Sequence, residues 1–160
     1  MLLCGIINEL RKSKDRSFLL SFFFCQATDS RINSATAVLR GLIYLLVAEQ
    51  PSLMSHVRER YNHAGRELFE DVNAWVAVTE ISINMLQDPG LKETYLIIDA
   101  LDEYMTDKSS LVDLIGQQAS VSSHVKWVVS SRNQPDLEES FTKANSKVKL
   151  YLELNPKIGV

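Results

Sequence analysis

The segment Tyr95–Glu103, with the sequence YLIIDALDE, constrains the fold more than any other part of the chain. Four apolar or aromatic residues precede Asp99, and two further acids, Asp102 and Glu103, follow it closely. A strand that is apolar along its whole length suits a parallel sheet with helices on both faces, because neither face then meets solvent. The segment therefore predicts a buried strand of an α/β fold, with three carboxylates at its carboxyl end.

Carboxylates in this position are typical of a Walker B strand. Ligands of open α/β sheets collect outside the carboxyl ends of the strands, so Asp99 is a candidate for holding Mg²⁺. Asp102 and Glu103 are candidates for the group that positions and deprotonates an attacking water. The structural alternative is that these acids cap the next helix, because negative charge is favoured at a helix N-terminus. Three acids directly after an apolar strand favour the functional interpretation.

The motif that accompanies a Walker B strand does not occur in the sequence. A loop of the form G-x-x-x-x-G-K-[ST] cradles the phosphates of a nucleotide, and no such string lies between Met1 and Val160. The helix predicted over residues 1–14 also starts without a capping residue, so we expect a segment with this loop to precede Met1. We predict that residues 1–160 alone bind ATP or GTP very weakly and hydrolyse neither.

The rest of the chain alternates between helical and strand patterns. Apolar residues at helical spacing predict helices over residues 1–14, 34–49, 53–61, 72–86 and 111–115. Continuous apolar runs predict strands at 17–25 and 125–131, on either side of 95–101 in one parallel sheet. Strict alternation over Val148–Leu154 predicts a further strand that is covered on one face only.

Composition excludes several classes of protein. A chain of 160 residues with 46% hydrophobic and 23% charged residues suits a single globular domain. A net charge of −3 gives no basic field for nucleic acid, and the apolar run Met1–Ile7 is too short for a membrane span. Cys4 and Cys25 form neither a disulfide framework nor a zinc motif. We expect a cytoplasmic protein that binds neither nucleic acid nor membrane.

Arg132 directly follows the strand predicted at 125–131. A guanidinium at that sheet edge can contact a γ-phosphate and report its presence. The alternative is an ordinary surface arginine paired with Asp99, Asp102 or Asp136. Next to a Walker B strand, the phosphate-sensing interpretation is favoured, and the preceding Ser130 and Ser131 are weaker polar candidates.

Two segments together, Tyr95–Glu103 and Lys126–Pro135, resemble the NACHT domain of STAND-class NTPases. The similarity is greatest to fungal NLR-like proteins related to heterokaryon-incompatibility factors, and Phe22–Gln26 and Thr36–Leu46 fit the same subgroup. The resemblance covers nearly the whole chain. It implies that residues 1–160 are a partial NACHT domain, a three-layer P-loop NTPase-like α/β fold in which the strand before the phosphate loop is absent.

The resemblance also implies a function, an ATP- or GTP-dependent signalling switch that needs Mg²⁺ and oligomerises with other NACHT chains. It assigns Asp99 to the Mg²⁺-associated acid, Asp102 and Glu103 to the acidic pair that follows, and Arg132 to the sensor 1 position. Without the phosphate loop, NTPase activity is not expected of this chain by itself. Two alternatives stay open: a stand-alone interaction or decoy module that pairs with full-length relatives, and an unrelated metal-dependent enzyme that uses Asp99 and Glu103.

Overall fold

Three parallel strands form the centre of the molecule. The computed structural model describes residues 2–13, 17–66, 73–103, 105–132 and 135–143. The strands are β1 (Phe18–Phe24), β2 (Glu93–Asp99) and β3 (Val125–Val129), in the order β1-β2-β3. The predicted α/β class and the predicted central position of the strand at 95–101 are both confirmed.

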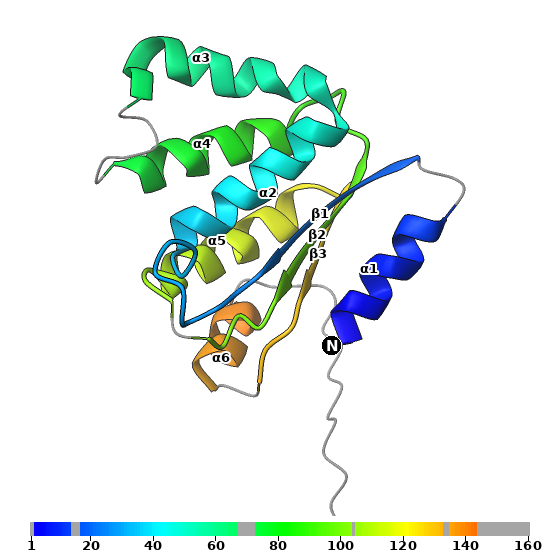
Figure 1. Ribbon diagram of the computed structural model, residues 1–160, viewed down its shortest axis with the longest axis vertical. Coiled ribbons are helices and arrows are strands. Elements are labelled where there is room, and N and C mark those ends of the chain that lie inside the picture. Colours follow the sequence, from blue (N-terminus) through cyan, green and yellow to red (C-terminus); the bar gives the residue numbers. More distant parts are fainter. Residues whose placement is uncertain (1, 14–16, 67–72, 104, 133–134, 144–160) are drawn as a thin grey trace, which may run out of the picture.

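Helices cover both faces of this sheet (Figure 1). Their bounds are α1 (Leu2–Lys12), α2 (Ala35–Glu49), the short 3₁₀ turn η1 (Pro51–Leu53), α3 (Met54–Ala64), α4 (Ala74–Leu86), α5 (Lys108–Val121) and α6 (Pro135–Lys143). Helix α1 lies on one face, whereas α2, α4 and α5 lie on the other. The five predicted helices are all present, and α6 is an additional one.

Local sequence signals explain where α2 begins and how closely it packs. The side chain of Ser34 accepts a hydrogen bond from the amide of Ala37, which caps the first turn. Gly41 then lets α2 approach β1, because a Cβ atom there would lie 2.5 Å from Cδ2 of Phe23. Helix α2 ends at Glu49. The next residue, Gln50, precedes Pro51, and a residue before a proline avoids helical geometry.

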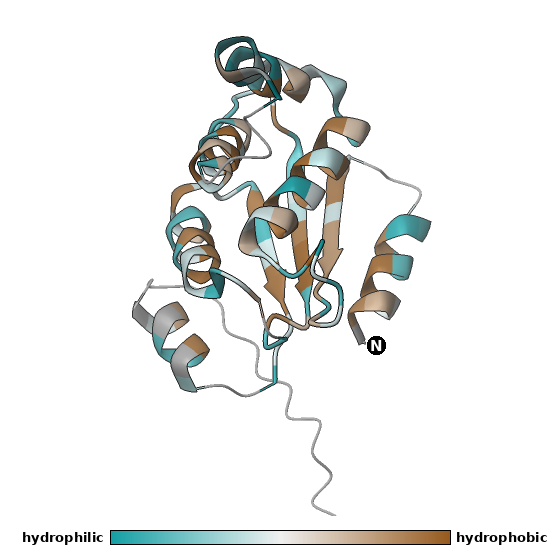
Figure 2. Cartoon of the chain, turned by 60° about the vertical axis from the view of Figure 1, so that its left-hand side comes forward, coloured by the Kyte–Doolittle hydropathy of each residue, from teal (hydrophilic) through white to brown (hydrophobic). Residues whose placement is uncertain are grey.

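The core is divided by the sheet into two unequal parts, and the strands themselves are strongly apolar (Figure 2). The larger cluster lies under α2, α4 and α5 and includes Leu96 and Ile98 of β2. The smaller one lies under α1 and consists of the buried residues Leu3, Ile7, Leu20 and Ile97. Because successive side chains of a strand point to opposite faces, β2 contributes to both clusters.

Helix α6 was not predicted from the sequence. It starts at Pro135, a residue suited to the first helical turn, and packs beside α5. Leu137, 8% exposed, and Phe141, four residues later, attach it to the larger core cluster. Because the helix is short and these two residues are its main apolar side chains, their contacts with the core hold it in place. The strand predicted at Val148–Leu154 lies outside the described residues.

No helix in the described residues is both long and apolar enough to cross a membrane.

Candidate functional site

The acids of the sequence motif lie where β2 ends. Asp99 is the last residue of the strand, and its carbonyl oxygen accepts a hydrogen bond of 3.0 Å from the amide of Cys25, just past β1. Ala100 follows with a φ of 57°, a left-handed conformation that turns the chain sharply. This turn ends β2 two residues earlier than the predicted bound of Leu101.

Ser130, the residue after β3, connects β3 to this turn. Its hydroxyl donates to Oδ1 of Asp99 and accepts the amide of Ala100 at 2.9 Å. Its own amide donates to the carbonyl of Ile98, and its carbonyl accepts the amide of Leu101, each at 2.9 Å. Four hydrogen bonds therefore fix the end of β3 against the carboxylate of Asp99.

Asp102 is bound by Arg132 through both carboxylate oxygens. Oδ1 accepts the backbone amide of Arg132 at 3.0 Å, and Oδ2 accepts its guanidinium Nε at 2.5 Å. The Asp102 side chain is only 5% exposed. Burial acts to raise the pKa of Asp102, but the side-chain and backbone hydrogen bonds from Arg132 outweigh it, and the net pKa is lowered. Asp102 is thus held ionised, with its oxygens occupied.

Glu103 is the more accessible of the two acids. Its side chain is 36% exposed, and Oε1 lies 3.6 Å from Nη2 of Arg132, beyond direct hydrogen-bond distance. Its amide donates to the carbonyl of Ala100 at 3.0 Å, which closes the turn after β2. Glu103 therefore has an anchored backbone and a carboxylate that solvent can reach.

The alternative in which these acids cap the next helix is wrong. Helix α5 begins at Lys108, and its N-cap residue is Asp107. Asp99 and Asp102 bond instead to residues that follow β3. The surface pairing of Arg132 with Asp102 is present, as the structural alternative for that arginine expected. Its role as a phosphate sensor stays a prediction.

Three carboxylates act on the buried thiol of Cys25 at this end of the sheet. Burial and the nearby carboxylates of Asp99, Asp102 and Glu103 together raise the pKa of the Cys25 thiol to about 12. In the described part of the chain, no three His, Cys, Asp or Glu side chains are grouped so that they could hold a metal ion. A cation at Asp99 would need water or phosphate oxygens to complete its coordination, as Mg²⁺ does when it binds a nucleotide.

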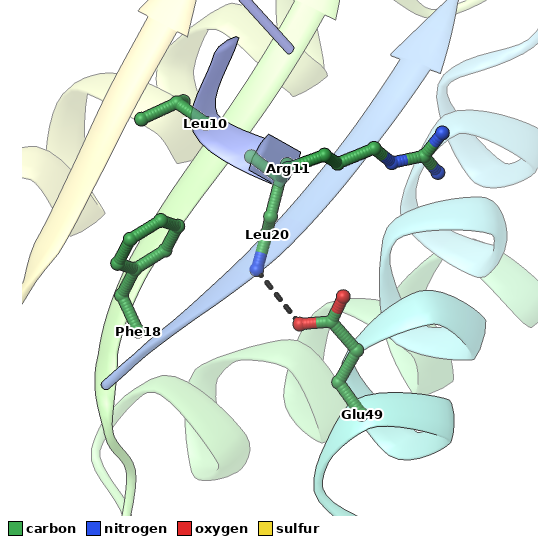
Figure 3. Close-up of a pocket in the computed structure, with 5 residues that line it drawn as sticks. All are labelled: Leu10, Arg11, Phe18, Leu20 and Glu49. Atoms are coloured by element: carbon green, nitrogen blue, oxygen red, sulfur yellow. Dashed lines mark hydrogen bonds between the residues drawn. The ribbon is translucent and has the colours of Figure 1, made fainter. Parts of the chain in front are cut away.

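A cavity of about 360 Å³ lies elsewhere, between α1, the start of β1 and the end of α2 (Figure 3). It is lined by Leu10, Arg11, Phe18, Leu20 and Glu49. Within it, Oε2 of Glu49 accepts the amide of Leu20 at 2.9 Å. This bond covers part of the free edge of β1, a common protection of edge strands. The cavity is thus separate from the acids at the other end of the strands.

The sequence pattern favoured Arg132 over Ser130 as the polar residue at the sheet edge and gave no indication of Glu49. The signal for Ser130 was its position, since the residue after β3 faces the end of β2 in a parallel pair. Glu49 gave no signal, because its partner Leu20 is 29 residues away in the sequence.

Similarity to known proteins covers most of the chain. Residues 1–132 match the protein family described as Nephrocystin 3, N-terminal. The vegetative incompatibility protein HET-E-1 of Podospora anserina is 63% identical over 155 residues, which is 97% of this chain. The chain spans only 11% of that relative's length. No solved structure is detectably similar.

Proposed function

Because this chain belongs to the nephrocystin 3 N-terminal family, we propose that it forms the Walker B half of a NACHT-type, nucleotide-dependent signalling switch. The observation that carries the proposal is the group of acids at the carboxyl end of the central parallel strand, beside an arginine at the end of the next strand. Similarity to a vegetative incompatibility protein supports a role in incompatibility signalling.

Asp99 takes the role of the Mg²⁺-associated acid. Its Oδ1 accepts the hydroxyl of Ser130, and its Oδ2 makes no hydrogen bond within the described part of the chain. One carboxylate oxygen, directed from a rigid strand end, suits an ion that binds proteins through one or two carboxylates and keeps several waters or phosphate oxygens. The carboxylates of Asp99, Asp102 and Glu103, which add to the effect of burial in raising the pKa of Cys25, also favour a cation here.

Glu103, rather than Asp102, takes the role of general base. A base needs a free oxygen within reach of a water, and both oxygens of Asp102 are occupied by Arg132. The lowered pKa of Asp102 makes it a still weaker proton acceptor. Asp102 then holds Arg132 at the sheet edge, and the 80% exposed side chain of Arg132 is placed to meet a phosphate that arrives from solution.

We predict that residues 1–160 alone bind Mg-ATP or Mg-GTP very weakly. The acids repel phosphate, and the sequence has no loop whose amides and lysine would attract it. Isothermal titration calorimetry measures the affinity, with the same chain fused behind a phosphate-binding segment of a related protein as the control. A low-micromolar dissociation constant for the unfused chain would show that the loop is unnecessary.

A second candidate function is supported by the outer edge of β3. The amide of Thr94 donates to the carbonyl of His124, and the amide of Ser130 donates to the carbonyl of Ile98. The backbone amides and carbonyls of the even-numbered residues of β3 and its flanks therefore point toward β2. The backbone groups of Val125, Trp127 and Val129 therefore point away from the sheet. Among the described residues no strand pairs with these groups, so they form an edge at which a full-length relative can add a strand, as an interaction module would.

Val129→Pro tests this edge, because it removes an outward amide while the bonds to β2 remain. We expect it to weaken pairing with full-length HET-E-1 at least about fivefold, since one backbone hydrogen bond is worth about 1 kcal/mol. Sedimentation of the mixed proteins measures the pairing, and thermal melting confirms folding. Val128→Pro, which removes an amide that faces β2, is the control for disruption of the sheet itself. Unchanged pairing in folded Val129→Pro would exclude this edge as the interface.

A further inference from the structure

We infer that Ser130 is a positioning residue that orients the carboxylate of Asp99 toward a divalent cation, an inference that rests on the function proposed above. Ser130 is the only side chain that hydrogen-bonds to Asp99 within the described residues. Its hydroxyl also accepts the amide of Ala100, the residue whose left-handed φ turns the chain. One hydroxyl therefore connects the carboxylate to the turn that presents it.

The direction of these hydrogen bonds is determined by chemistry. A serine hydroxyl has one proton to donate, and an amide can only donate. Because the amide of Ala100 donates to Oγ of Ser130, the hydroxyl proton is directed to Oδ1 of Asp99. The result is a relay from the Ala100 amide through Ser130 to Oδ1 of the Asp99 carboxylate.

The position of Oγ in this relay is rigid. The amide and carbonyl of Ser130 both bond to the β2 segment, at Ile98 and Leu101. The strand register pairs Ile98 with Val129, so Ser130 lies opposite Asp99. With both its amide and its carbonyl bonded to the β2 segment, Ser130 can fix the plane of the carboxylate to which its hydroxyl donates.

A fixed carboxylate plane matters for the cation. Oδ1 is occupied by Ser130, which leaves Oδ2 as the oxygen available to a metal. Mg²⁺ requires near-octahedral geometry, so a ligand that rotates freely binds it less well. Loss of a hydrogen bond that orients a metal ligand typically lowers metal affinity about 10- to 100-fold.

Ser131 is a matched control in the same segment. Its hydroxyl donates to the carbonyl of Arg132 at 2.7 Å, and its side chain is exposed. Ser131→Ala removes the same number of atoms from the neighbouring residue without touching Asp99. Ser130→Thr keeps the hydroxyl and suits an extended backbone, so it is the conservative variant for rescue.

The experiment uses residues 1–160 with Mn²⁺ alone as the probe. Carbon-detected NMR follows the carboxyl signal of Asp99 while Mn²⁺ is added to millimolar concentration, and hydrogen exchange follows the amide of Ala100. We expect Mn²⁺ to broaden the Asp99 signal, with about 10-fold more metal needed in Ser130→Ala. Ser130→Thr and Ser131→Ala should both behave as wild type. The Ala100 amide should exchange faster only in Ser130→Ala.

Three results would overturn the inference, and they are distinguishable from one another. Equal broadening in wild type and Ser130→Ala means that Asp99 binds the cation without help from Ser130, and the proposed function survives. No broadening of Asp99 in wild type removes its metal role, and both the inference and that part of the proposed function fail. Faster exchange of Ala100 without a change in Mn²⁺ affinity would limit Ser130 to a structural role.

Discussion

Glu103→Gln slows nucleotide hydrolysis by about 10²- to 10⁴-fold in a chain that carries a phosphate-binding segment ahead of Met1, if Glu103 is the general base. Glutamine keeps the size and polarity of the side chain but cannot accept the proton. Nucleotide affinity should change little, because Glu103 is 36% exposed and its carboxylate makes no direct hydrogen bond in the described part of the chain. Single-turnover hydrolysis and calorimetry on the same preparation measure the two effects separately.

Two further variants separate the roles of the acids. Asp99→Asn should weaken only the Mg²⁺-dependent part of nucleotide binding, because a neutral amide is a poorer ligand for a hard cation. Asp102→Asn should loosen Arg132 from the sheet edge, since it removes the charge that Nε of Arg132 contacts at 2.5 Å. If Glu103→Gln hydrolyses nucleotide at the wild-type rate, Glu103 is not the base.

Ile98→Ala destabilises the folded chain by about 2–5 kcal/mol, the usual cost of a large-to-small change in a well-packed core. Ile98 is completely buried, belongs to the central strand and packs in the larger core cluster. Urea unfolding followed by tryptophan fluorescence measures the loss, because Trp127 packs against the same cluster. So large a loss can unfold a small domain outright.

The control for this change is Val76→Ala on α4. The Val76 side chain is 55% exposed, and substitutions at such surfaces usually change stability by less than about 0.5 kcal/mol. A loss of less than about 1 kcal/mol for Ile98→Ala would show that β2 is not the packed centre of the domain.

Local patterns were sufficient for the elements that carry strong periodicity. The apolar run before Asp99 predicted a strand buried on both faces, and β2 pairs with β1 and β3 on either side. The helix from Ala35 to Glu49 was also predicted, because its apolar spacing and the proline after it are local features. Helix α6 was missed, since it is short, has few apolar residues, and packs against α5, which is not a local feature of the sequence.

The candidate site also combines features that the local sequence predicts with features that only tertiary contacts decide. The sequence by itself determined which residues lie together, because the carboxyl ends of parallel strands meet at one edge and each motif follows its strand directly. It could not determine which oxygen bonds to which donor. The pairing of Arg132 with Asp102, and of Ser130 with Asp99, joins residues 30 and 31 positions apart, and only the register of β2 against β3 decides it. A shift of that register by one residue would exchange the side chains that face each other, which is why the hydrogen-bond partners of the acids were decided only by the tertiary structure.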